Sequence, residues 1–164
     1  MAKAYIALGS NLEGPAQQVQ AAALAIAALP ECQFIKLSSL YETAPVDCPE
    51  HEATPVPNFI NAVLMVTTTL SPHALLTALH TIENEAGRQR PYINAPRVLA
   101  CDLMLYDDLM INDSTLTLPH PRMHQRGFVL LPLFEIDPHL SIPNHGKIAT
   151  LIAPQPFTGI KRQG

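Results

Sequence analysis

The sequence has little charge, few aromatic residues and only three cysteines. Charged residues make up 15% of the 164 residues and aromatic residues 5%, whereas hydrophobic residues reach 48%. This balance excludes a disordered or fibrous chain and favours one compact domain over residues 1–164, with a flexible tail from about residue 150. Three unevenly spaced cysteines cannot all pair, so we expect free thiols and a cytoplasmic location.

Long apolar segments are also missing. The N-terminal residues 1–6 lack the apolar core and the small-residue cleavage site of a signal peptide, and no run approaches the length of a membrane span. The net charge of −4 disfavours a nucleic-acid binder, because such proteins need a broad basic surface. We therefore expect no membrane partner and no nucleic-acid partner, and a monomer that acts on small molecules.

The positive charge that is present gathers in one part of the chain. Half of the ten Lys and Arg residues lie between positions 88 and 126, and no lysine is among them. Arginine presents a planar fork of donors that fits two phosphate oxygens at once, and clustered cations repel one another unless an anion compensates them. The cluster favours a small polyphosphate ligand. Its members are Arg88, Arg90, Arg97, Arg122 and Arg126.

The spacing of apolar residues predicts alternating strands and helices. A period of two is typical of strands, and spacings of three and four are typical of helices. Strands are expected over 3–8, 34–41, 59–68 and 98–106, helices over 15–29, 72–87 and 129–136, and a hairpin turn at 144–146. Two strand-helix-strand units in this order predict an α+β fold. It is the ferredoxin-like split βαβ sandwich, an antiparallel sheet with helices packed on one face.

The strand over 98–106 carries one carboxylate on a face that has room for two. Alternation puts Ala100 and Asp102 on one face, roughly 6.6 Å apart, and Cys101 on the other, core-facing side. Two carboxylates at this spacing would suit magnesium ions, which prefer carboxylate and phosphate oxygens, whereas a thiol is a poor ligand for magnesium. From the strand alone, Asp102 is either a metal ligand or the partner of an arginine.

Several other residues have a structural explanation beside a functional one. Asn61 lies in an apolar strand, where a buried amide needs a partner. Phe59 and Phe128 are either core aromatics or platforms for a flat ligand, and periodicity does not separate these interpretations. His120 and His124 are four residues apart, but a proline between them and the lack of a third ligand disfavour a zinc site.

Short motifs follow one another along nearly the whole chain. They include Tyr5 to Leu12, Ser38 to Pro45, Asn58 to Ala62, Gly87-Arg88-Gln89-Arg90, Pro96-Arg97, Asp102 to Tyr106, Leu118-Pro119-His120, Arg126-Gly127-Phe128 and Pro132 to Ile136. In this order the motifs resemble those of the 6-hydroxymethyl-7,8-dihydropterin pyrophosphokinase family. The resemblance implies transfer of pyrophosphate from ATP to the pterin hydroxymethyl group, with release of AMP, in folate biosynthesis and with Mg²⁺ as cofactor.

The resemblance also implies roles for individual residues. The pterin would lie between Phe59 and Phe128, with Asn61 reading its edge and with backbone groups near Thr43, Ala44 and Val46 completing the pocket. The triphosphate would be held by Arg88, Arg90, Arg97, His120 and Arg126. Asp102 would bind the metal, and Arg88, Arg97 and Asp102 would carry catalysis.

The chain departs from the family pattern at the metal site. The family motif Leu-Asp-x-Asp reads Leu99-Ala100-Cys101-Asp102 here, and Asn94, Ala95 and Pro121 replace a usual tryptophan, glycine and tyrosine. A working enzyme would need water, substrate oxygens or a neighbour such as Glu83 in place of the missing carboxylate. Two alternatives stay open: a binding homologue with impaired or no catalysis, and a ferredoxin-like RNA-binding or regulatory module, which the low aromatic content disfavours.

Overall fold

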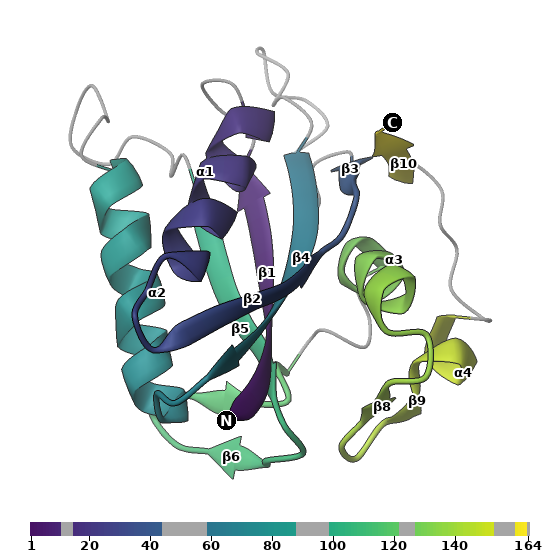
Figure 1. The fold of residues 1–164 in the computed structure, drawn as a ribbon. Helices are drawn as coiled ribbons and strands as arrows, with labels where there is room; N and C mark the ends of the chain where they lie inside the picture. The colour runs from purple at the N-terminus through teal and green to yellow at the C-terminus, as the bar shows by residue number, and fades with distance from the viewer. Residues whose placement is uncertain (11–14, 44–58, 88–98, 122–126, 153–159, 164) are drawn as a thin grey trace.

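The computed structural model describes residues 1–10, 15–43, 59–87, 99–121, 127–152 and 160–163 (Figure 1). The elements are β1 (Ala2–Ser10), α1 (Pro15–Ala27), β2 (Cys32–Leu37), β3 (Leu40–Thr43), β4 (Phe59–Thr68), α2 (Pro72–Gly87), β5 (Ala100–Tyr106), β6 (Ile111–Asn112), β7 (Thr117–Leu118), α3 (Gly127–Ile136), β8 (Ser141–Ile142), β9 (Gly146–Lys147), α4 (Ile148–Ile152) and β10 (Ile160–Gln163).

An antiparallel sheet forms the centre of the molecule. Its strands follow the order β10-β3-β4-β1-β5, and β2 also pairs with β4. The units β1-α1-β2 and β4-α2-β5 interleave in this order, with β1 and β4 adjacent in the middle. This arrangement is the predicted split βαβ fold of the α+β class.

The sheet buries a hydrophobic cluster on each face. On one face, alternate residues of β1 and β4, such as Ile6 and Leu64, pack against Val19 of α1 and Leu79 of α2. On the other face, the intervening residues pack against α3, through side chains that include Tyr5, Val63, Met65, Val129 and Leu130. The expectation that helices pack on one face therefore holds for α1 and α2, whereas α3 covers part of the opposite face (Figure 1).

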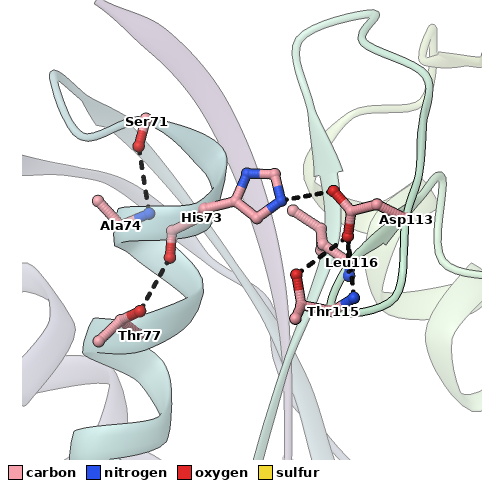
Figure 2. Close-up of polar contacts among 7 residues, drawn as sticks. All are labelled: Ser71, His73, Ala74, Thr77, Asp113, Thr115 and Leu116. Atoms are coloured by element: carbon pink, nitrogen blue, oxygen red, sulfur yellow. Dashed lines mark hydrogen bonds and ion pairs between the residues drawn. The ribbon is translucent and has the colours of Figure 1, made fainter.

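Helix α2 begins where the sequence predicts it. The hydroxyl of Ser71 accepts a hydrogen bond from the N–H of Ala74 at 3.2 Å, and Pro72 occupies the first helical position. In the same turn His73 contacts Asp113 at 2.8 Å, which ties α2 to the β6–β7 turn (Figure 2). The backbone N–H of Thr115 and the His73 ring together hold the pKa of the Asp113 carboxyl well below its usual range.

Two segments differ from the sequence prediction. The strand expected over 34–41 is broken into β2 and β3 at Ser38 and Ser39. The sequence prediction also contains no strand near the C-terminus, where β10 pairs with β3 through Ile160 and Thr43, and the flexibility expected from about residue 150 stays a prediction. Four residues are too few for a hydrophobic period to be recognised, which is why this edge strand was missed. The predicted turn is confirmed, with Asn144 and Gly146 at positive φ.

None of the described helices is long and apolar enough to span a membrane. This finding concerns only the part of the chain that the structure describes.

Two buried groups that lose a proton at alkaline pH, the Cys101 thiol and the Tyr5 hydroxyl, predict that the free energy of unfolding falls as the pH rises. Burial raises the pKa of the Cys101 thiol, and the carboxylates of Glu83 and Asp102 raise it further. Burial and a hydrogen bond to Asp137 raise the pKa of the Tyr5 hydroxyl. Above about pH 9 the unfolded chain therefore releases protons that the folded chain keeps, and each proton lowers the free energy of unfolding by up to about 1.4 kcal/mol per pH unit.

Urea unfolding at pH 8 and pH 10.5 would measure this loss. We expect Cys101→Ala and Tyr5→Phe each to flatten the pH dependence, whatever they do to stability at pH 8. Equal alkaline losses in the unaltered chain and in both variants would contradict the assignment.

Candidate functional site

A row of paired residues crosses the sheet on the face that α3 partly covers. Ala100 of β5 pairs with Gly9 of β1, Gly9 pairs with Asn61 of β4, and Asn61 pairs with Tyr41 of β3. Residues that are directly opposite in an antiparallel pair point to the same face. Four strands therefore contribute one side-chain position each to a common row, and the residues at its β5 and β1 positions are small.

A second row lies beside the first. Asp102 pairs with Ala7, and Ala7 pairs with Val63. Asp102 is half-buried, and Ala7 packs against the cluster on the α3 face. Asp102 and Asn61 thus stand on the same face, two strands apart and two residues apart along the strands, which corresponds to roughly 12 Å between their backbones. Only Gly9 and Ala7 of β1 lie between them.

Gly9 allows the Asn61 side chain to lie across β1. A Cβ atom added at Gly9 would stand 2.9 Å from Oδ1 of Asn61, closer than such atoms approach in proteins. Asn61 is 8% exposed, so it is a buried polar residue of this row. A side chain at position 9 would therefore require the Asn61 amide to shift from its present position.

Cys101 points away from this face, as predicted. It is 2% exposed and packs with Leu99 and Leu103 in the cluster that α1 and α2 cover. Because burial keeps the thiol protonated by raising its pKa, Cys101 is no substitute for the carboxylate that position 100 lacks. Ala100 itself is partly exposed on the opposite face.

Glu83 reaches the same strand from α2. Its Oε2 accepts a hydrogen bond from the backbone N–H of Cys101 at 2.9 Å. Strand β5 is an edge strand of the described sheet, so its outer amides are accessible to such a side chain. The contact places a carboxylate at the backbone position between Ala100 and Asp102. The sequence predicts Glu83 as a candidate replacement for the missing carboxylate, and the structure adds its contact with β5.

His120 also lies next to β5. Its backbone N–H donates to the carbonyl of Met104 at 3.0 Å, two residues along the strand from Asp102. The segment after β7 is therefore fixed to the part of β5 that carries the carboxylate. His120 and Asp102 come from separate parts of the sequence, and this backbone bond brings them together.

The two phenylalanines come from elements that pack on each other. Phe59 begins β4, is half-buried, and pairs with Thr43 of β3. Phe128 belongs to the first turn of α3, and that helix packs on β4 and β3. The side chains of Thr43 and Phe128 lie outside the described residues.

The remaining predicted site residues lie outside the described residues altogether. They are Arg88, Arg90, Arg97, Arg126, Ala44 and Val46. Arg88 directly follows α2, and Arg126 directly precedes α3. Among the residues that the structure does describe, no three His, Cys, Asp or Glu side chains come together as a group that could hold a metal ion.

Comparison with known proteins identifies the family. Residues 5–138 match the model of the 7,8-dihydro-6-hydroxymethylpterin-pyrophosphokinase family. The chain belongs to this family. A 2-amino-4-hydroxy-6-hydroxymethyldihydropteridine pyrophosphokinase of Haemophilus influenzae is 43% identical over 93% of the chain and 92% of the relative. The Pseudomonas aeruginosa protein of the same name is 39% identical over 98% of the chain and 96% of the relative.

Solved structures agree in fold. A crystal structure of HPPK-DHPS in complex with substrates superimposes with a TM-score of 0.75 over 98% of the chain, at 14% identity. A Plasmodium falciparum HPPK-DHPS structure superimposes with a TM-score of 0.71 over 99% of the chain, at 16% sequence identity. The chain spans less than half of each of these longer proteins, 46% and 47%. At such identities the likeness supports the fold alone.

These matches confirm the predicted family and fold class. They also confirm the predicted class of enzyme, a pyrophosphokinase of folate biosynthesis, and do not favour the RNA-binding or regulatory module. The roles of individual residues, the cytoplasmic location and the monomeric state stay predictions.

Proposed function

We propose that the chain transfers the terminal diphosphate of ATP to 6-hydroxymethyl-7,8-dihydropterin. The pterin hydroxymethyl oxygen attacks the β-phosphorus, the bond from this phosphorus to the oxygen bridging the α-phosphate breaks, and AMP leaves. One observation carries the assignment. Asn61 and Asp102 stand on one face of the sheet with only Gly9 and Ala7 between them, in a chain of the pyrophosphokinase family.

The β4 side of this face suits the pterin. An amide is both a donor and an acceptor, so Asn61 is able to pair with the donor and acceptor edge of the pterin ring. Phe59 lies at the start of the same strand, and Phe128 on α3 is the proposed second ring that stacks on the ligand. Backbone groups of Thr43, Ala44 and Val46 complete the proposed pocket, because β3 leads into this segment next to Phe59.

The β5 side suits the triphosphate. His120 is fixed to β5 through its backbone, and Arg88, Arg90 and Arg97 lie in the sequence between α2 and the same strand. We assign these residues, together with Arg126, to the phosphate oxygens. Transfer of a phosphoryl or diphosphoryl group depends mainly on positioning and on neutralising charge, and arginine forks provide both. Arg88 and Arg97 are the proposed catalytic arginines.

The donor set on β5 fits magnesium. This ion binds through one or two carboxylates, substrate phosphates and water. Asp102 is a carboxylate of β5, and Glu83 of α2 brings a second carboxylate to the edge of the same strand, at the N–H of Cys101. When bound, Mg²⁺ neutralises charge on the phosphate oxygens. We propose Asp102 as the principal metal ligand of the chain and Glu83 as the carboxylate that compensates for Ala100.

Replacing Glu83 is expected to weaken metal binding. Glu83→Gln keeps the shape of the side chain and removes its charge, so we expect the affinity for Mn²⁺ in the presence of a non-hydrolysable ATP analogue to fall by on the order of tenfold. Electron paramagnetic resonance of free Mn²⁺ measures this without turnover. Glu85→Gln is the matched control, since Glu85 is an exposed residue of the same helix. Equal Mn²⁺ affinities of the two variants would contradict the role of Glu83.

Product analysis tests the reaction itself. We expect ATP and hydroxymethyldihydropterin with Mg²⁺ to yield AMP and pterin diphosphate in equal amounts. Formation of ADP would instead indicate transfer of a single phosphate. No nucleotide product from a chain that still binds pterin would support the catalytically inactive homologue.

A further inference from the structure

A carboxylate of α3 collects four hydrogen bonds from the junction between β2 and β3. The backbone N–H of Ser39 donates to both oxygens of Glu135, at 3.1 Å and 3.0 Å. The Ser39 hydroxyl donates to Oε2 at 2.9 Å, and the Tyr41 hydroxyl donates to Oε1 at 2.8 Å. Glu135 is half-buried in the last turn of α3, so these bonds attach the helix to one short stretch of the sheet.

This junction contains one extra residue. Leu37 pairs with Leu64, and Tyr41 pairs with Asn61, so four steps along β2 and β3 correspond to three steps along β4. Ser38 covers the gap: its N–H donates to the carbonyl of Val63 at 3.0 Å, and its hydroxyl accepts from the N–H of Val63 at 2.9 Å. The N–H of Ser39 donates to the Glu135 carboxylate instead of to a carbonyl of β4. The arrangement is a β-bulge, a feature that re-aims the residues after it.

The bulge sets the register of β3. With it, Tyr41 lies opposite Asn61 and Thr43 lies opposite Phe59. A slip by one residue would move every β3 side chain to the other face of the sheet, because side chains alternate along a strand. The β3 strand also leads directly to Ala44 and Val46. Whatever fixes the bulge therefore fixes the pterin side of the proposed site.

We propose that Glu135 is a positioning residue for pterin binding, acting through Ser39 and Tyr41 on β3. This inference rests on the proposed function. The carboxylate is suited to the task because all four hydrogen bonds are donated to it, and bonds to a charged acceptor are stronger than neutral ones. The proposed function assigns the phosphate groups to the other side of the site, to β5 and the arginines that precede it in the sequence. Loss of the Glu135 carboxylate should therefore weaken the binding of the pterin and leave the binding of ATP unchanged.

Glu135→Gln is the test variant. It preserves the packing of α3 but places an amide NH₂ where an acceptor is needed. We expect the Kd for hydroxymethyldihydropterin, measured by ligand fluorescence, and the KM for the pterin to rise on the order of tenfold, as the loss of one charge-assisted hydrogen bond would produce. The KM for ATP should change less than about twofold. Hydrogen exchange should show faster exchange in 38–43 and no change in β1 or β5.

Tyr41→Phe removes one of the four donors and keeps the ring, so it serves if Glu135→Gln does not fold. We expect a smaller rise in the pterin Kd and KM, again without a change for ATP. Glu85→Gln is the charge-matched control and should leave both substrates unaffected. Equal effects on pterin and ATP, or a lower Tm with unchanged pterin affinity, would show that Glu135 is purely structural and would overturn the proposal.

Binding and exchange separate this inference from the proposed reaction. If the unaltered chain makes no AMP but binds pterin, and Glu135→Gln weakens that binding, the positioning role stands and the proposed turnover fails. If the chain makes AMP and Glu135→Gln leaves the pterin affinity unchanged, the reaction stands and the positioning role fails. No pterin binding by the unaltered chain overturns both.

Discussion

Asp102→Asn should reduce kcat by about a thousandfold or more, because the variant loses the principal proposed carboxylate for the metal and the triphosphate. Among the described residues, Asp102 is the carboxylate that β5 presents on the α3 face, next to Ala7. Asparagine has nearly the same shape, and the position is half-buried, so the fold should persist. AMP formation measures kcat, and fluorescence of the bound pterin measures the Kd, which we expect to change little because Asn61 lies two strands away.

Asp108→Asn is the control for this variant. Asp108 is exposed in the turn after β5, and its replacement removes the same charge without touching the proposed site. We expect its kcat to equal that of the unaltered chain. If Asp102→Asn kept more than a tenth of the activity, Asp102 would not be the metal ligand on which turnover depends.

Ala100→Asp should raise kcat, by about tenfold to a hundredfold, since it restores a second carboxylate two residues from Asp102 on the same face. Position 100 is open enough to solvent for a longer side chain to reach away from the sheet. Ala100 is partly exposed, and its neighbour across the strand pair is Gly9, so the nearest side chain in this row is that of Asn61, which lies across Gly9. An interaction made with the reacting phosphates changes kcat more than it changes the affinity for the pterin, so the pterin Kd should stay within about twofold.

Ala100→Asn separates charge from size in this experiment. It fills the same space without a carboxylate, and we expect no gain in kcat. An Ala100→Asp variant with unchanged kcat would mean that the missing ligand does not limit the rate. The double variant Ala100→Asp/Glu83→Gln tests whether Glu83 compensates for the missing carboxylate at position 100. If it does, Glu83→Gln should lower the Mn²⁺ affinity less in the Ala100→Asp background than in the unaltered chain.

Alternation and helical spacing predicted the elements that pack in the middle of the molecule. The strands β1 and β4 and the helices α1 and α2 have long, regular patterns, because each buries a defined face. Helix α3 is apolar on most sides, so its sequence did not show which face of the sheet it covers. The break at Ser38 and Ser39 was missed because side-chain hydrogen bonds to Val63 and Glu135 replace the strand ladder there.

The site was predictable where it depends on one strand and unpredictable where it depends on register. Alternation alone placed Ala100 and Asp102 on one face and Cys101 on the other. The close approach of Gly9 to Asn61, the contact of Glu83 with Cys101 and the bonds of Glu135 to β3 join residues far apart in the sequence. Local patterns carry no information about such contacts, which exist only once the strands are paired.

A crystal structure of the ternary complex tests the central claim most directly. The complex would contain Mn²⁺, hydroxymethyldihydropterin and an ATP analogue with a methylene group between the α- and β-phosphates, which blocks the bond that transfer breaks. We predict anomalous scattering from Mn²⁺ bound to the Asp102 carboxylate, with Glu83 on the same metal site, and the pterin edge on Asn61. Mn²⁺ held by the nucleotide alone, with no carboxylate of the chain as a ligand, would contradict the account.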